Sequence, residues 1–131
     1  MSGLASTIKQ ADWKSEKHMP VIECPDSVKA GEAFDVKAWL GKGVAHPNTT
    51  EHHISDITLF FVPDGGKVPF KVGVYRFAAH GESAKGANEG PVFTNPQVTT
   101  NVTLKESGTF IAVSFCNIHG MWESEKAVTV A

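Results

Sequence analysis

The sequence is poor in cysteine, in clustered charge and in long apolar segments. Its 131 residues include two cysteines, Cys24 and Cys116, so at most one disulfide can form and a disulfide-rich secreted scaffold is excluded. The 12 Lys and Arg residues are scattered among 14 Asp and Glu residues, and the formal net charge is -2. Because nucleic-acid-binding domains carry a basic surface, we expect no nucleic-acid partner.

Membrane-spanning and export segments are also missing. The longest strongly apolar run, residues 57–62, is much too short to cross a bilayer, and residues 1–14 contain no apolar signal-peptide core. We therefore expect a cytoplasmic protein without a membrane partner, whose cysteines stay reduced. Cys24 precedes Pro25 and has no nearby histidine, so we interpret it as an incidental thiol.

The residues that are present favour β-structure. The length, together with 41% hydrophobic and 20% charged residues, is typical of one globular domain, which we expect to span residues 1–131. Alternating and β-branched segments recur between turn residues such as those at 63–66 and 106–108. We predict an all-β, immunoglobulin-like antiparallel β-sandwich of about seven strands. The clearest strands are expected at residues 33–40, 54–62, 70–77, 98–104, 109–115 and 126–130.

Two segments are expected to lie outside the strands. Pro20 disfavours a helical residue before it, so His18 is predicted to lie on an extended arm or loop. Residues 81–90 are rich in Gly, Ser, Ala, Asn and Glu and predict a mobile surface loop. We interpret His80, just before this loop, as a structural residue and not a ligand.

A Cys-x2-His pair directly follows the strand predicted at residues 109–115. Cys116 and His119 can point a thiolate and an imidazole at one metal ion if they lie on a short turn. A rigid strand before the turn would hold both donors in place. Alone this spacing is a weak signal, so further ligands are needed to support a metal site.

Other histidines occur in segments without an apolar face. His18 is one, and His46 and His52 are six residues apart across a Pro-Asn-Thr-Thr segment that can turn. His52 and His53 are neighbours entering a strand, so their side chains must point to opposite faces and we predict that only His52 binds. Four imidazoles and one thiolate exceed the four ligands of a structural zinc site. Such a set favours a redox metal, with iron and an open coordination position as the preferred choice.

The segments that carry these residues resemble a known family. Residues 16–20 (Glu-Lys-His-Met-Pro), 46–53 (His-Pro-Asn-Thr-Thr-Glu-His-His) and 116–120 (Cys-Asn-Ile-His-Gly) are similar, in order and spacing, to three motifs of the neelaredoxin-type superoxide reductases. These proteins share the iron-binding domain of the desulfoferrodoxin family. The resemblance covers nearly the whole chain. No Cys-x2-Cys precedes this region, so the desulforedoxin-like N-terminal domain of some relatives is expected to be absent.

The resemblance implies a function and a role for each motif residue. It implies one-electron reduction of superoxide to hydrogen peroxide at a mononuclear iron that alternates between Fe2+ and Fe3+. It implies re-reduction by rubredoxin or a similar small carrier, and a homo-oligomer, either a dimer or a tetramer. Lys17 would lie above the open position, and Glu16 would bind that position in the oxidised state. The implied ligands are four equatorial histidines and an axial cysteine: His18, His46, His52, His119 and Cys116.

Other functions remain open from the sequence. A type 1 copper protein also uses a late Cys, His and Met on a β-sandwich, but Met121 follows His119 too closely and copper would leave His18 and His52 without a role. A structural zinc module would leave Glu16 and Lys17 unexplained. A superoxide dismutase would use similar chemistry but would consume no net reductant.

Overall fold

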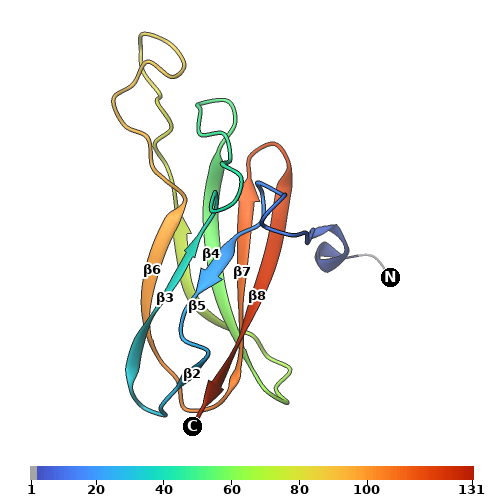
Figure 1. Cartoon of the computed structure of the whole chain (residues 1–131). Helices are drawn as coiled ribbons and strands as arrows, with labels where there is room; N and C mark the ends of the chain where they lie inside the picture. Colours follow the sequence, from blue (N-terminus) through green and yellow to red (C-terminus); the bar gives the residue numbers. More distant parts are fainter. Residues whose placement is uncertain (1–2) are drawn as a thin grey trace.

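The computed structural model describes residues 3–131, and its regular secondary structure is almost entirely β-strand (Figure 1). A short 3-10 helix, η1, lies near the N-terminus at Leu4–Thr7. Eight strands follow, with these bounds: β1 Val21–Glu23, β2 Ser27–Val28, β3 Ala33–Trp39, β4 Ile54–Pro63, β5 Phe70–Arg76, β6 Gln97–Thr103, β7 Gly108–Cys116 and β8 Gly120–Val130.

The strands form two sheets that pack face to face. The smaller sheet has the order β1-β3-β6, and the larger has the order β2-β8-β7-β4-β5. All pairs are antiparallel except β2 and β8, which run parallel. The predicted all-β sandwich is therefore confirmed, with eight strands where about seven were expected.

The strand prediction was wrong in two places. The last strand begins at Gly120 and not at residue 126, because the β7–β8 turn is short and Cys116 pairs directly with Gly120. The short strands β1 and β2 were missed because two or three residues cannot display an alternating pattern.

The core lies between the sheets and follows the alternation of the long strands. The inward side chains of β3, β4 and β7 are almost fully buried, whereas their neighbours along each strand are more exposed. Phe110 of β7 is completely buried, with its ring centroid 5.0 Å from that of Phe61 and 6.3 Å from that of Phe34. Phe34 lies on β3, so its contact with Phe110 joins the two sheets, whereas Phe61 lies on β4, beside β7 in the same sheet.

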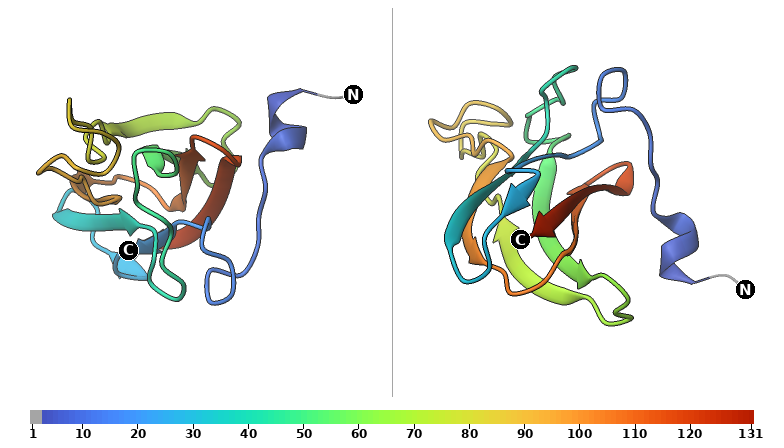
Figure 2. Two further views of the ribbon diagram at one scale, coloured as in Figure 1. Left: turned by 90° about the horizontal axis from the view of Figure 1, so that it is seen from above. Right: turned by 60° about the horizontal axis from the view of Figure 1, so that its bottom comes forward.

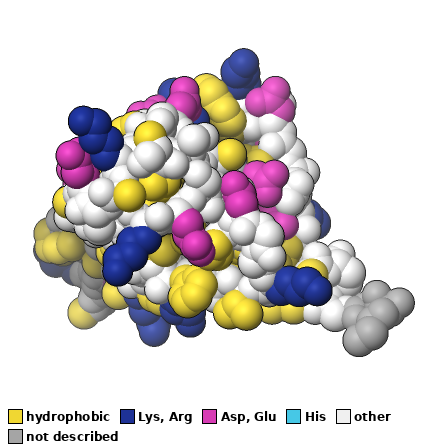
Figure 3. Space-filling view, turned by 90° about the horizontal axis from the view of Figure 1, so that it is seen from below, with side chains coloured by type: hydrophobic (Ala, Val, Ile, Leu, Met, Phe, Trp, Pro, Cys, Tyr) yellow, Lys and Arg dark blue, Asp and Glu magenta, His cyan; other side chains and the backbone are white. Residues whose placement is uncertain are grey.

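Loops gather at one end of the sandwich, the upper end in Figure 1. The β3–β4 loop, the β7–β8 turn and the segment before β1 all reach this end, and these are the segments that carry the predicted ligands. Figure 3 views the opposite end, where hydrophobic, basic and acidic side chains are mixed and no histidine is visible among the coloured side chains. Among the described residues, no helix is long and apolar enough to span a bilayer.

The predicted surface loop at residues 81–90 contains no helix or strand. The backbone N–H of Gly90 donates to the carbonyl of Gly81, which closes the loop at 2.9 Å. Asn88 joins the loop to the β3–β4 connection through two hydrogen bonds with Thr50. Its Oδ1 accepts from the backbone N–H of Thr50 at 2.8 Å, and its backbone N–H donates to Thr50 Oγ1 at 3.0 Å. The loop is therefore tied to the segment that carries His46 and His52.

Candidate metal centre

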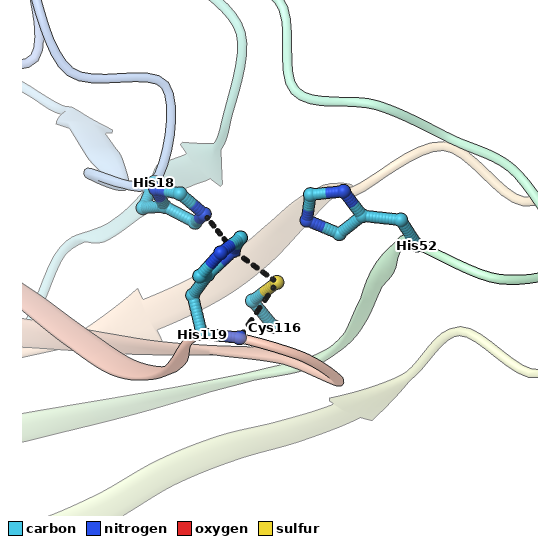
Figure 4. Close-up of side chains that lie close together, drawn as sticks. All are labelled: His18, His52, Cys116 and His119. Carbon is cyan, nitrogen blue, oxygen red and sulfur yellow. Dashed lines mark hydrogen bonds between the residues drawn. The ribbon is translucent and has the colours of Figure 1, made fainter.

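Four side chains from three separate segments meet at the upper end of the sandwich (Figure 4). The candidate ligand atoms of His18, His52, Cys116 and His119 all lie within 4.8 Å of one another. His18 comes from the arm before β1, His52 from the β3–β4 loop, and Cys116 and His119 flank the β7–β8 turn. The spacing in the sequence predicted this group, and the two sheets bring its members together.

His46 lies beside this group and completes a ring of four imidazoles. Its ring centroid is 4.8 Å from that of His18 and 4.7 Å from that of His52. His119 closes the ring at 5.0 Å from His52 and 4.8 Å from His18. The distance between His18 and His52, at 6.3 Å, is longer than all four sides. The rings therefore occupy the corners of an approximate square, with His18 and His52 at opposite corners.

Hydrogen bonds to acceptor oxygens show which ring nitrogen is available on His18 and on His46. His18 Nδ1 donates to Glu16 Oε1 at 2.7 Å, while its Nε2 lies 3.1 Å from His119 Nδ1. His46 Nδ1 donates to the carbonyl of Pro47 at 2.7 Å. The Nε2 atoms of His46 and His52 are buried and have no hydrogen-bond partner among residues 3–131.

Buried polar atoms without partners are costly, and a metal ion would satisfy both of these nitrogens. The donor set therefore fits a metal that accepts several imidazoles and one thiolate. The available atoms are Nε2 of His18, His46 and His52, Nδ1 of His119 and Sγ of Cys116.

The sulfur of Cys116 is held by the turn that follows it. Cys116 is fully buried at the end of β7, and the backbone N–H of His119 donates to its Sγ at 3.4 Å. Asn117 ties the turn to the neighbouring loop, because its Nδ2 donates to the carbonyl of Glu51 at 2.8 Å and its Oδ1 accepts from the backbone N–H of His53 at 2.9 Å. This network fixes the thiolate relative to His52.

Burial favours the neutral form of three of the imidazoles. It lowers the pKa of His46 to about 4, although the hydrogen bond to the Pro47 carbonyl opposes this effect. Burial also lowers the pKa of His52 and of His18, where the Glu16 carboxylate acts in the opposite direction. A neutral imidazole keeps the lone pair that a metal needs, so the site is prepared for binding.

Glu16 and Lys17 lie at the edge of the cluster and are both partly exposed. Glu16 Oε1 accepts from the backbone N–H of His18 at 3.1 Å as well as from its ring. Burial raises the pKa of Glu16, but the hydrogen bonds from His18 outweigh this and hold that pKa below its usual value. The positive charge of Lys17 lies close enough to help lower the pKa of His18, His46 and His52.

Two supporting residues were not identified from the sequence. The ring of Trp122 stacks on His18, with centroids 4.9 Å apart and planes at 11°. Ser114 Oγ donates to the backbone carbonyl of His18 at 3.0 Å. The alternation of β7 could have indicated Ser114, since this residue shares the inward face with Ala112 and Cys116.

Four other residues considered in the sequence lie outside the cluster. His53 stacks on His80, and both are held by protein oxygens. Met121 pairs with Phe115 on the outer face of the larger sheet, away from the buried sulfur of Cys116, so a copper site with an axial Met121 is not supported. Cys24 is half-buried, and burial raises the pKa of its thiol. It forms no disulfide with Cys116.

The chain is similar to known proteins over nearly its whole length. The model of the desulfoferrodoxin family matches residues 10–125. A neelaredoxin from Megalodesulfovibrio gigas is 54% identical over 127 residues, which cover 97% of this chain and 98% of the relative. A superoxide reductase from Pyrococcus furiosus is 47% identical over 122 residues, covering 93% of this chain and 96% of the relative.

Solved structures agree with this relationship. A protein of Thermotoga maritima superposes with a TM-score of 0.97 at 53% identity, covering 100% of this chain and 99% of its own. The superoxide reductase (neelaredoxin) of Archaeoglobus fulgidus in its reduced form superposes with a TM-score of 0.86 at 46% identity, covering 94% and 98%. The sequence comparison and the structural comparison therefore point to the same relatives. The chain belongs to the desulfoferrodoxin family.

Proposed function

We propose that this chain is a superoxide reductase that converts superoxide to hydrogen peroxide with one electron and two protons. The observation that carries the proposal is the square of four imidazoles with a buried thiolate beside it. Iron suits mixed imidazole and thiolate ligands, and five protein donors leave one position of an octahedron for a small anion. The names of the Pyrococcus furiosus and Archaeoglobus fulgidus relatives support this activity.

Five side chains would hold the iron, which when bound would supply the electron that superoxide accepts. The proposed ligands are the three Nε2 atoms of His18, His46 and His52, the Nδ1 atom of His119 and the thiolate of Cys116. The buried, unpartnered nitrogens of His46 and His52 are the strongest support for this set. Glu16 fixes the tautomer of His18 by accepting from its Nδ1, an arrangement that usually raises the affinity of a histidine for a metal.

Cys116 is proposed to set the reducing strength of the site. A thiolate donates more charge than an imidazole, and the N–H of His119 moderates that charge through its hydrogen bond to the sulfur. The full burial of Cys116 keeps water from this sulfur. The thiolate and its single backbone donor therefore act together in tuning the potential.

Lys17 is proposed to attract the substrate. Superoxide is an anion and the chain has a formal net charge of -2, so a local positive charge beside the open position would aid its approach. Glu16 Oε1 accepts from both N–H groups of His18, so binding the open position through this oxygen would break those hydrogen bonds. We propose that Glu16 binds the open position only in the oxidised enzyme.

The oxidised site would need an electron from outside, and we propose rubredoxin or a similar small carrier as the donor. His119 is the one exposed member of the ligand group formed by His18, His52, Cys116 and His119, and the neighbouring Ile118 side chain is 57% exposed. Since electron transfer needs a short path, the β7–β8 turn is the proposed entry point. We place this reaction in the cytoplasm.

Elemental analysis and visible spectroscopy test the proposed site. Chain produced in iron-containing medium is expected to contain one iron per chain and to absorb visible light, whereas bound zinc would be colourless. His52→Ala is expected to lower the iron content, and the neighbouring His53→Ala is the matched control that keeps it. Equal iron content in both variants, or zinc in place of iron, would contradict the proposal.

A further inference from the structure

The segment that carries Glu16 and Lys17 begins with a compact turn. The backbone N–H groups of Ser15 and Glu16 donate to the carbonyl of Asp12 at 3.1 and 2.9 Å. We call residues 12–16 the arm turn. Because Glu16 is its last residue and Lys17 follows directly, the place of both side chains at the metal centre depends on where the arm turn lies.

The hydrogen bonds of the arm turn do not attach it to the sandwich. Among the described residues, the hydrogen bonds of residues 12–17 all stay within residues 12–19. The arm turn is therefore held against the rest of the chain by packing, and its position depends on the segment that it packs against.

That segment is the first part of the β3–β4 loop, which continues to His46. Figure 2 shows the arm turn, in blue, beside residues 41–45, in teal. A Cβ atom on Gly43 would lie 2.9 Å from the Cα of Lys14 and 2.9 Å from the carbonyl oxygen of Trp13. These separations are too short for a van der Waals contact, and no side-chain rotation can relieve them because both atoms belong to the backbone. Glycine is therefore needed for the loop and the arm turn to approach this closely.

The neighbouring Lys42 contacts a side chain of the arm turn. Its Nζ lies 4.9 Å from the centroid of the Trp13 ring and 5.7 Å from that of Trp39 in β3, and it donates to Glu23 Oε1 in β1 at 2.7 Å. Both rings lie within the range of cation–π attraction. Lys42 therefore joins the arm turn to two strands of the smaller sheet.

We propose that Lys42 and Gly43 are positioning residues that hold the arm turn, and with it Glu16 and Lys17, at the metal centre. The roles of Glu16 and Lys17 in this inference rest on the proposed function, whereas the contacts of Lys42 and Gly43 do not. While the arm turn is held, Glu16 stays within hydrogen-bond distance of His18. A released arm turn would let Glu16 leave His18 more easily and would no longer fix Lys17 beside the open position.

Hydrogen exchange tests the contacts directly, by mass spectrometry on the arm-turn peptide of the full chain as purified. Lys42→Ala should speed exchange of this peptide about two- to fivefold, the loss expected for one exposed cation–π contact, and Lys42→Arg should restore the slow exchange. Gly43→Ala should speed it about tenfold or more, because the added Cβ displaces the arm turn. Gly43 has no positive φ, so alanine acts there through its Cβ and not through backbone strain. Lys37→Ala, which removes the same charge from the Trp39 ring alone, is the matched control.

Two further measurements connect the arm turn to the metal centre. Gly43→Ala leaves the net charge unchanged, yet it should slow the reaction with superoxide by up to the roughly tenfold expected for Lys17→Ala. The double variant Gly43→Ala/Lys17→Ala should be at most about twofold slower than Lys17→Ala alone, because Gly43 acts through Lys17. The visible spectrum of oxidised Gly43→Ala should shift towards that of Glu16→Ala, with the iron content unchanged.

Two results would overturn the proposal. One is exchange of the arm turn that stays at the wild-type rate in both Lys42→Ala and Gly43→Ala. The other is faster exchange with an unchanged superoxide rate and an unchanged spectrum, because the arm turn would then be held without effect on Glu16 or Lys17. A wild-type chain without superoxide reductase activity would contradict the proposed function and not the contacts, which the exchange measurement tests independently.

Discussion

His53 and His80 stack face to face, with ring centroids 3.5 Å apart and planes within 5° of each other. His80 is buried, and its Nε2 donates to the carbonyl of Phe77 at 2.6 Å. Its Nδ1 lies 3.2 Å from Asn48 Oδ1. The stack therefore supports the loop between His46 and His52, since His53 Nδ1 also contacts the carbonyl of Thr49 at 2.9 Å.

His80→Ala is expected to destabilise the chain without emptying the metal site. Loss of the ring leaves the buried carbonyl of Phe77 without this partner, which should lower the free energy of unfolding by about 1–3 kcal/mol. Urea denaturation and iron analysis of the same preparation measure both effects. His53→Ala should cost less because His53 is less buried. If His80→Ala or His53→Ala lost as much iron as His46→Ala, the substituted histidine would be a ligand.

Cys116→Ser is expected to fold but to lose the visible thiolate-to-iron absorption and most of the reductase activity. A serine hydroxyl is a much weaker electron donor than a thiolate, so the loss should exceed the roughly 10- to 100-fold typical of residues that only support a ligand. Cys24→Ser is the control. A Cys116→Ser protein that keeps both the absorption band and the activity would refute the proposed ligand role.

Lys17→Ala should slow the reaction with superoxide by about tenfold and flatten its dependence on ionic strength, because a local attractive charge has been removed. Iron content and the visible spectrum should not change. Lys67→Ala changes the net charge equally on an exposed turn at the opposite end of the sandwich and should leave the rate unaltered. Rapid mixing at low and high salt measures the rate with superoxide and its dependence on ionic strength. If Lys17→Ala and Lys67→Ala gave the same rate and the same salt dependence, Lys17 would not be the residue that attracts superoxide.

The metal-free chain should lose stability as the pH falls from about 6.5 to about 4. Burial lowers the pKa of His46 from 6.5 to about 4 in the folded state, so the unfolded chain binds more protons in this interval and protonation favours unfolding. The contribution is at most about 3 kcal/mol. Denaturation of metal-free His46→Gln across this interval should show a smaller pH dependence than the unaltered chain. An identical dependence would mean that His46 does not titrate as described.

Much of the candidate site could be predicted because its donors lie in short motifs. Cys116 and His119 are three residues apart at one turn. His52 could be chosen over His53 because neighbours that enter a strand were expected to point to opposite faces, and His53 indeed stacks on His80 outside the cluster. Trp122 and Ser114 were missed because their contacts to His18 depend on how the arm before β1 crosses the larger sheet. That path is a tertiary property that no local pattern contains.

The fold was predicted where the strands alternate and missed where they do not. Burial alternates along most of β3, β4, β6 and β7, and the strands β3 to β7 were each found within one or two residues of their observed bounds. The first half of β8 was missed, since the last strand was expected only from residue 126; Glu123, Ser124 and Glu125 are polar, and β7 pairs with all three. Sheet pairing overrode the local preference there.

The stoichiometry of superoxide consumption tests the central claim most directly. The purified iron-loaded chain would receive a known amount of superoxide together with a reduced small electron donor, and the donor consumed, the peroxide formed and the oxygen evolved would be measured. A superoxide reductase should consume one donor electron and form one hydrogen peroxide for each superoxide, without evolving oxygen. Oxygen evolution with half as much peroxide and no donor consumed would identify a dismutase and contradict the account.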